Sequence, residues 1–295
     1  MAAVNPIAAT GLADEVGATR GVPAKPARSR AGQRNLATFR YVTFTVFGLF
    51  FLLPMLAMLR FSLERATGSG GWSLAAWTTI PSYQIPNGPP LLSGVEITLE
   101  IALIVSIIVL VLVLPTMIWI HLRVRWLSRV MEFMSLLPLT LPAIVLVVGL
   151  APVYNKIEQH NVSALMLCWA YGILVLPYVY RALAAGLGAI DATTLSEAAR
   201  SLGARWPVVM FRVIAPNMWQ AILNALMLTI ALVCGEFTIA YLLGYNTLPV
   251  DLFAISRNAT NASVLFSGSA AALLFTFLLL VIVSYAGRRL QRHRA

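Results

Sequence analysis

Charged side chains are scarce in this sequence of 295 residues: Asp, Glu, Lys and Arg together make up only 11%, while hydrophobic residues make up 59%. A soluble globular domain carries about a quarter charged residues. The mean hydropathy of +0.82 agrees with this imbalance. The composition excludes an ordinary soluble domain and indicates an integral membrane protein.

Residues that carry metal or redox chemistry are also rare. The two cysteines, Cys168 and Cys234, lie inside apolar stretches, so neither a disulfide framework nor a cysteine metal site is indicated. The three histidines, His121, His160 and His293, are scattered and form no acid–base or metal cluster. We therefore predict no catalytic residue, no metal ligand and no bound cofactor, which disfavours a membrane enzyme. A Gly-X4-Gly-Lys-Ser/Thr phosphate loop is absent too, so the chain does not hydrolyse ATP by the usual means.

Long apolar runs, in contrast, are abundant. A helix needs about 20 mostly apolar residues to cross roughly 30 Å of hydrocarbon. Runs of this kind occupy residues 39–61, 96–120, 130–151, 163–185, 217–243 and 268–287. The sequence thus predicts an all-α fold, a polytopic bundle of six transmembrane helices over residues 39–287.

Basic residues divide unequally between the two sides of this bundle, and loops rich in Lys and Arg stay in the cytoplasm. One side holds Arg20, Lys25, Arg28, Arg30, Arg34, Arg40, Arg123, Arg125, Arg129, Arg181, Arg200, Arg205, Arg212, Arg288, Arg289, Arg292 and Arg294. The other side holds Arg60, Arg65, Lys156 and Arg257. Both termini are therefore predicted to be cytoplasmic.

The two ends of the chain are predicted to be basic cytoplasmic tails. Residues 1–38 are rich in Pro and Ala and lack the apolar core of a cleaved signal peptide, so we expect a disordered tail there. Residues 288–295 form the second tail. Because the basic residues cluster between apolar runs, the net charge of +10 indicates membrane orientation rather than nucleic-acid binding.

Prolines interrupt several of the predicted spans. Helix breakers at membrane depth are tolerated where protein or a water-filled cavity satisfies the freed backbone groups. They indicate either a pathway through the bundle or simple packing kinks, at Pro54, Pro115, Pro138, Pro142 and Pro177. The long predicted external loop at 62–95, with Trp72 and Trp77, either lies on the membrane or receives a partner.

The segment 190–216 is the longest half-polar interval between two predicted spans. Asp191 is suited to cap a helix and Gly203 to end it. Leu195, Ala198, Ala199 and Leu202 have the spacing of one apolar helical face. We expect a second short helix to begin near Trp206 and to stop before Pro216.

Periodicity alone leaves two interpretations of this segment. The helix either lies in the headgroup layer, with its arginines on lipid phosphates, or docks into a cytoplasmic partner. The arginines in question are Arg200, Arg205 and Arg212.

The run "EAARSLGARWPVVMFRVIAP" resembles the EAA signature of permease subunits of ATP-binding-cassette importers. Glu197, Ala198, Ala199, Gly203 and Pro216 match that signature in register. The departures are Val213 for Ile and Ala215 for Leu, both still apolar.

In that family this loop is the coupling helix that sits in a groove of the ATP-binding subunit. The resemblance therefore implies ATPase coupling by Glu197, Ala198, Ala199, Leu202 and Gly203. For Glu197, a local pairing with Arg200 is the alternative to a contact with the partner.

The resemblance also implies a set of partners: two ATP-binding subunits that hold the ATP, a sister or identical permease, a periplasmic solute-binding protein and membrane lipid. The chain would then be the permease of a bacterial inner-membrane importer of a small polar solute. The alternative is a stand-alone channel or secondary transporter whose 195–216 loop lies on the membrane. No internal repeat of the kind seen in many secondary transporters is recognisable.

Glu236 lies inside the fifth predicted span, where ionisable residues are costly and face the bundle interior or a pathway. It either lines the translocation path, makes a structural hydrogen-bonded contact or is exposed at the interface. Glu96, Glu100 and Glu132 are interpreted as boundary charges. The surrounding "GEFTIAYLL" with the following "TLP" is similar to permeases of the polyamine branch, whose relatives serve ferric iron, thiamine, sulfate and aminophosphonates such as 2-aminoethylphosphonate. A carboxylate in the path would suit a cationic amine.

Overall fold

The computed structural model describes residues 30–64, 71–85, 88–158, 163–257 and 262–292. The chain divides into two compact units, Met1–Met55 and Leu56–Ala295. Regular structure in the described residues is helical throughout, apart from two isolated bridges, Glu64 to Trp72 and Gln84 to Pro90. The predicted all-α class is confirmed for this part of the chain.

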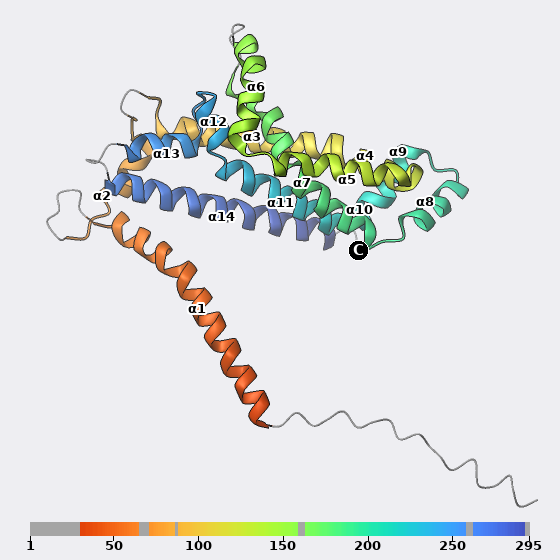
Figure 1. The fold of residues 1–295 in the computed structure, drawn as a ribbon, viewed down its shortest axis with the longest axis horizontal. Helices are drawn as coiled ribbons and strands as arrows, with labels where there is room; N and C mark the ends of the chain where they lie inside the picture. Colours follow the sequence, from red (N-terminus) through yellow and green to blue (C-terminus); the bar gives the residue numbers. More distant parts are fainter. Residues whose placement is uncertain (1–29, 65–70, 86–87, 159–162, 258–261, 293–295) are drawn as a thin grey trace, which may run out of the picture. The chain divides into compact units, whose positions relative to one another are not determined.

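The helices follow one another with short connections, and Figure 1 shows their arrangement along the chain. Within the second unit, α8, α9 and α10 gather at one end of the bundle and α12 and α13 at the other. The elements are α1 Arg30–Ser62, α2 Ala75–Thr79, η1 Ile80–Ser82, α3 Leu91–Ile108, η2 Val109–Val113, α4 Leu114–Arg123, α5 Arg125–Thr140, α6 Ala143–Glu158, η3 Ala164–Met166, α7 Leu167–Gly188, α8 Ala192–Ser201, α9 Trp206–Val208, η4 Val209–Ile214, α10 Ala215–Asn217, α11 Trp219–Gly235, α12 Thr238–Leu242, α13 Leu248–Ser256 and α14 Ala262–Arg292.

Four helical stretches of the described chain are long and apolar enough to cross a membrane as single pieces: Thr38–Ser62, Leu91–Arg123, Ala164–Gly188 and Ala262–Arg289. Each contains or closely matches one of the predicted spans. Two further spans result only if each of two bent helix pairs counts as one crossing. The structure therefore supports a multi-pass membrane protein with four to six spans.

The third predicted span, 130–151, is not one straight helix. The stretches Trp126–Thr140 and Ala143–Tyr154 meet at an angle of 98°. Leu141, between them, is extended at φ −94° and ψ 129° because the following Pro142 disfavours helical geometry in the residue before it. Hydropathy registers the apolar composition of this stretch but not its break.

The fifth predicted span, 217–243, is also interrupted. Its main helix α11 ends at Gly235, and Glu236 leaves the helix with φ −77° and ψ 123°. The five-residue helix α12 then begins at Thr238. At its other end, α11 meets the stretch Trp206–Asn217 at 81°.

The two predicted tails are partly helical. Helix α1 begins at Arg30, so it includes residues 30–38 of the range predicted as the N-terminal tail. Helix α14 continues to Arg292 and takes in most of the predicted C-terminal tail. Residues 1–29 and 293–295 lie outside the described residues.

Helix α7 forms the centre of the bundle, and α11 and α3 pack against it. Its Leu167, Val175, Val179 and Leu183 are fully buried. Close approach of α7 and α11 depends on glycine, because a side chain at Gly186 would collide with the Cβ of Ala221. Small residues at such contacts are the usual device for packing membrane helices.

A second, smaller core lies at the end of the bundle that carries α12 and α13. It contains Ile85, Leu91, Leu248 and Ile255, with half-buried neighbours from η1 and α14. This cluster fixes the described part of the 62–95 loop on the bundle. The described residues of the loop near η1 therefore pack on the bundle, and whether the loop lies on the membrane or receives a partner stays a prediction.

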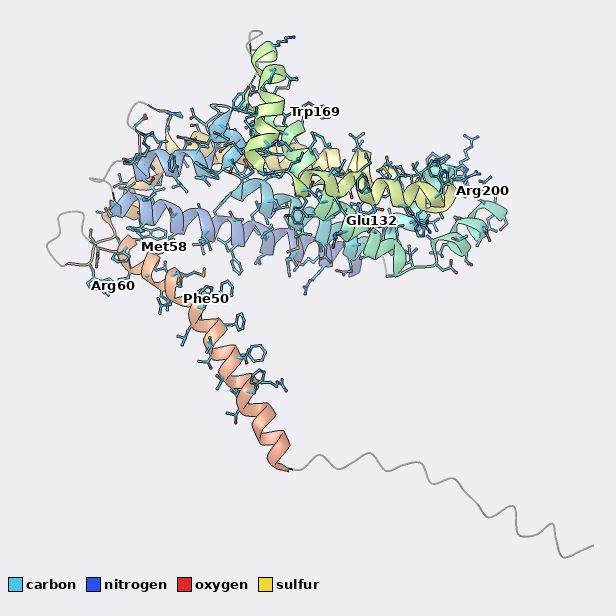
Figure 2. All side chains as sticks on the ribbon, viewed as in Figure 1. Phe50, Met58, Arg60, Glu132, Trp169 and Arg200 are labelled. Carbon is cyan, nitrogen blue, oxygen red and sulfur yellow. The ribbon has the colours of Figure 1, made fainter. Side chains whose placement is uncertain are left out.

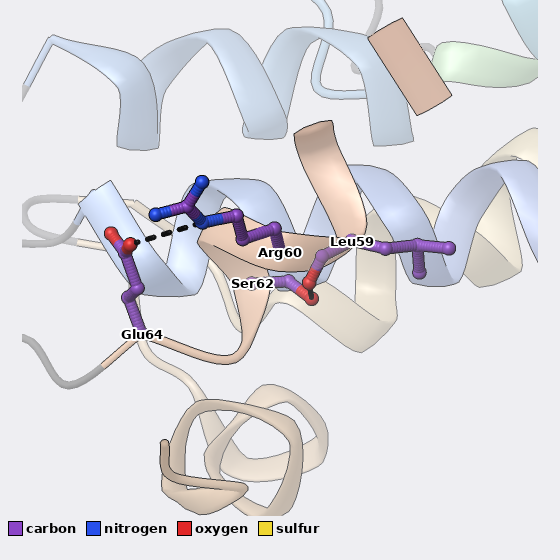
Figure 3. Close-up of polar contacts among 4 residues, drawn as sticks. All are labelled: Leu59, Arg60, Ser62 and Glu64. Atoms are coloured by element: carbon purple, nitrogen blue, oxygen red, sulfur yellow. Dashed lines mark hydrogen bonds and ion pairs between the residues drawn. The ribbon is translucent and has the colours of Figure 1, made fainter. Parts of the chain in front are cut away.

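The end of α1 within the second unit is joined to this loop through Ser62, and Figure 3 shows the polar contacts at this helix end. Ser62, which is fully buried, donates to the Leu59 carbonyl at 2.7 Å and accepts from the Trp77 indole at 3.3 Å. Phe61 stacks on Phe266 of α14 at 5.3 Å between ring centroids. The nearby pair Arg60–Glu64, at 3.7 Å, is exposed to solvent and adds little stability.

Candidate functional site

Helix α8 is held at both ends by its own side chains and backbone. Asp191 accepts a hydrogen bond from the Thr194 amide at 3.1 Å and another from the Thr194 hydroxyl at 2.7 Å. After the last turn, Gly203 takes φ +85°, a left-handed conformation that suits glycine. The Gly203 amide donates to the backbone carbonyl of Arg200 at 2.9 Å, and the Ala204 amide donates to the backbone carbonyl of Ala199 at 3.0 Å. These two bonds form a Schellman motif. The predicted cap and stop are confirmed.

The predicted apolar face of α8 is divided between two environments. The side of the helix that packs against η4 is formed by Ala192 and Ser196, with 1% and 5% exposed, and by half-buried Ala199. Ala198 points away from that contact, and Leu202 is 89% exposed. The expectation of a single face over all four residues is therefore wrong, because Leu202 sits beyond the last full turn as the C-cap.

Glu197 is exposed on the outer side of α8, next to Ala198. The described residues show no ion pair between Glu197 and Arg200, the local pair considered as the alternative, and the Arg200 guanidinium lies over the Trp206 ring instead. The outer surface of α8 therefore presents Glu197, Ala198 and Leu202 together. Because the caps fix the helix, these three side chains have a defined arrangement.

The helical segment after α8 is longer than expected. It runs without a break from Trp206 to Asn217, passing through the π-helical stretch Val209–Ile214. The expected stop before Pro216 is wrong, since Pro216 stands in the first turn of α10, where its missing N–H is tolerated. The actual turn comes at Met218, with φ −106° and ψ 24°.

The indole of Trp206 lies at the centre of a cation–π cluster. The Arg200 guanidinium lies 4.6 Å from the ring centroid, and the Arg123 guanidinium lies 4.5 Å from it. Trp119 contacts Trp206 edge-on at 5.5 Å. Figure 2 places Arg200 at the end of the bundle where α4, α8 and α9 meet.

Glu236 occupies the break between α11 and α12 and is half-buried. Both of its carboxylate oxygens accept from the Ile239 amide, at 3.0 and 3.2 Å. The structure thus gives Glu236 the structural contact that was one of the three alternatives. The Glu236 carboxylate also lies near the buried hydroxyl of Tyr171. That hydroxyl has no hydrogen-bond partner among the described residues.

An aromatic cluster beside Glu236 was not anticipated from the sequence. Phe237 stacks on Tyr241 at 5.0 Å, and Phe253 contacts both rings edge-on at 5.1 and 5.2 Å. Tyr241 and Phe253 are 42% and 38% exposed. The spacing of Phe237 and Tyr241 by one helical turn would have indicated half of this cluster.

A buried polar cluster joins α13 to α3 and was also missed. Thr98 donates to the Gly94 carbonyl at 2.7 Å and accepts from the Leu248 amide at 3.0 Å. A side chain at Gly94 would collide with the Asp251 carboxylate, which is 2% exposed. Within the described residues, Oδ2 of Asp251 and the hydroxyl of Thr247 have no hydrogen-bond partner. Burial raises the pKa of Asp251 from 3.8 to about 7.

The predicted boundary charges lie at the surface. Glu96, Glu100 and Glu132 are all exposed, and Figure 2 marks Glu132 on α5. Among the described residues, no group of three or more His, Cys, Asp or Glu side chains is arranged to hold a metal ion. The polar groups of interest are therefore those of α8, of the break at Glu236 and of the contact between α13 and α3.

A family model described as "Binding-protein-dependent transport system inner membrane component" matches residues 118–295. No curated protein matches the chain. The matched region is more than half of the sequence and includes α8, Glu236 and Asp251.

Proposed function

Because the chain belongs to the family of binding-protein-dependent transport system inner membrane components, we propose that it is the permease of an ATP-driven importer. This family is a membrane transport component and not an enzyme. The chain contributes the translocation path. Two ATP-binding subunits supply the energy, a sister or identical permease completes the path, and a periplasmic binding protein delivers the solute.

The observation that carries this proposal is the outer surface of α8. Glu197, Ala198 and Leu202 are exposed on a helix that is capped at both ends. Leu202, which is 89% exposed at the helix end, offers an apolar side chain whose burial in a partner's groove would be favourable. The small side chain of Ala198 lets a partner backbone approach closely.

Energy transfer then follows from rigidity. Closure of the ATP-binding subunits carries α8 with it, and α8 packs directly against η4. From η4 the helical segment continues through α10 to α11, the helix that ends at Glu236. Ala199 supports this by its half-buried contact with the bundle, and Gly203 by ending the helix sharply.

The membrane arrangement that suits this role has six spans, with each bent helix pair counted as one crossing. Both termini and the coupling segment, residues 190–216, then lie in the cytoplasm of a bacterium. The clustering of basic residues on that side supports this orientation. Reporter fusions after Arg292 and within the 62–95 loop test it, with the C-terminal fusion expected to be cytoplasmic and the loop fusion external.

For the solute we favour a polyamine-type cation. The half-buried Glu236 carboxylate, set at a helix break inside an apolar segment, supports a role in guiding a positive charge. A family member that carries 2-aminoethylphosphonate, ferric iron, thiamine or sulfate is the alternative. Thermal-shift screening of the binding protein encoded beside this chain separates these solutes. Uptake that is unchanged in Glu236→Gln would remove Glu236 from the path.

Co-purification tests the coupling role of α8. The full transporter is expressed with wild-type permease, with Glu197→Arg combined with Ala198→Trp, and with Ala75→Trp as the control. Ala75 is also an exposed alanine in a short helix, at the opposite end of the bundle. We expect the double variant to lose the ATP-binding subunit and the control to retain it. An intact complex with normal uptake in the double variant would contradict the proposal and favour a stand-alone channel or secondary transporter.

A further inference from the structure

Trp206, on α9, brings together side chains from the neighbouring helix α8 and from α4, which is distant in the sequence. It is the first residue of α9, and Arg200 from α8 and Arg123 from the end of α4 both place a guanidinium over its ring. Within the described ranges, neither arginine has a carboxylate partner within 4.0 Å. The aromatic ring is therefore the principal partner of both charges.

The cluster gives α8 a second connection to the bundle. The first connection is the packing of Ala192 and Ser196 against η4, which leads toward α10 and α11. The second runs from Arg200 through Trp206 to Arg123, and so to the span Leu91–Arg123. Trp119 of the same span supports it by edge contact with Trp206.

The span Leu91–Arg123, which receives this second connection, contains a point at which its bend can change. Its middle is the π-helical stretch Val109–Val113, and Pro115 follows in the first turn of α4. Such stretches are the usual places where a helix changes its bend. Movement applied at Arg123 therefore acts on α4, on the C-terminal side of the π-helical stretch at which α4 can change its angle to α3.

We propose that Trp206 is a positioning residue that ties α8 to the second span, so that movement of the coupling helix is passed to α4 as well as to α11. This rests on the proposed function, because it presupposes that α8 is moved by an ATP-binding subunit. Trp206 contacts neither ATP nor solute. Its effect is on how much transport follows from each cycle of ATP hydrolysis.

The experiment uses the assembled transporter in proteoliposomes with its binding protein, in anionic and in purely zwitterionic lipid. The variants are Trp206→Leu, Trp206→Phe and, as the control, Trp126→Leu. Trp126 is 71% exposed on α5 and lies outside the cation–π cluster. Retention of the ATP-binding subunit, ATP hydrolysis and solute uptake are measured together.

We expect Trp206→Leu to keep the ATP-binding subunit and to hydrolyse ATP within about twofold of wild type, while uptake per ATP falls at least about threefold. Trp206→Phe retains an aromatic face for both arginines and is expected to restore most of the ratio. Trp126→Leu is expected to behave as wild type. The same pattern is expected in both lipids, since the partners of Trp206 are in the protein.

An unchanged ratio of uptake to ATP hydrolysis in Trp206→Leu would overturn the inference while leaving the proposed function intact. A defect confined to anionic lipid would overturn it in favour of a headgroup site formed by Arg123 and Arg200. Loss of the ATP-binding subunit would also overturn it, because Trp206 would then belong to the docking surface. If Trp206→Leu does not fold, Arg123→Gln and Arg200→Gln are compared singly and combined. We expect the losses in uptake per ATP to be non-additive in the combined variant. Additive losses would contradict the inference that both arginines act through the Trp206 ring.

Discussion

The two ends of the Leu56–Ala295 unit differ in how they hold their charged groups, although each leaves a leucine exposed, Leu202 at one end and Leu74 at the other. At the end that carries α8, the arginines stack on an indole while Leu202 is left exposed. At the end that carries α13, the apolar groups form a small core while Asp251 and Thr247 are buried with an oxygen that has no partner in the described chain. Unpaired buried polar groups weaken the packing that contains them. The α13 end is thus held together less firmly and in a way that depends on pH, whereas the α8 end holds its arginines on an aromatic ring.

The largest expected effect concerns the pH response of the α13 end. Because the pKa of Asp251 in the folded protein is about 7, above its ordinary 3.8, the folded state holds a proton that the unfolded state has lost. Stability therefore falls as pH rises from about 4 to about 7, by on the order of 4 kcal/mol for three pKa units. The Asp251→Asn variant removes this fall and is more stable than wild type at pH 8. Thermal unfolding in detergent, followed by tryptophan fluorescence at several pH values, measures it.

The control for this response is Glu96→Gln, which alters an exposed carboxylate near the same end. It should keep the wild-type dependence on pH. If Asp251→Asn keeps that dependence as well, the buried carboxyl is not what makes this end sensitive to pH.

The second effect concerns the close contact of α3 with α13. Gly94→Leu places a side chain where the Asp251 carboxylate lies, so we expect a loss of about 1–3 kcal/mol in unfolding free energy. Gly149→Leu is the matched control, since no atom lies within 4 Å of the position where its Cβ would stand. Equal unfolding temperatures for the two variants would show that the α13 end is not tightly packed at Gly94.

The third effect concerns the exposed leucine of α8. Leu202→Ser should leave the unfolding temperature unchanged, because the side chain is 89% exposed. Burial of a leucine in a groove contributes about 1.5–3 kcal/mol, so the affinity for the ATP-binding subunit should fall about tenfold or more. Titration of the purified ATP-binding subunit onto permease in nanodiscs measures the affinity. Leu74→Ser, a 65% exposed leucine at the opposite end, should bind as wild type; equal losses for both would remove the distinction between the ends.

The smallest effect concerns the rigidity of α8. Asp191→Ala removes the N-cap hydrogen bonds of the helix, at a cost of about 1 kcal/mol. Hydrogen exchange of the amides in the first turn of α8 should accelerate about fivefold, while exchange in α13 stays the same. Unchanged exchange in α8 would indicate that packing of Ala192 and Ser196 fixes the helix without the cap.

Features set by neighbouring residues could be predicted from the sequence. The Asp191 cap and the Gly203 stop follow from the backbone needs of a helix end, and most spans follow from apolar length alone. The breaks at Leu141 and Glu236 could not be obtained in this way, because an apolar run has the same hydropathy whether it is straight or bent.

Features set by contacts between distant parts of the chain were beyond sequence reasoning. Arg200 offered a local partner in Glu197, but the fold places it on Trp206, together with Arg123 from another span. Asp251 gave no signal in the sequence, because only the fold shows that it packs on Gly94. In both cases the decisive partner lies on another helix.

Photo-crosslinking in native membranes tests most directly whether the outer surface of α8 docks an ATP-binding subunit. A photoreactive amino acid is placed at position 202, and in a second sample at position 75 on α2, with the whole transporter expressed. We expect a strong cross-link from position 202 to the ATP-binding subunit and none from position 75. A position 202 that cross-links only to lipid, or as weakly as position 75, would contradict it.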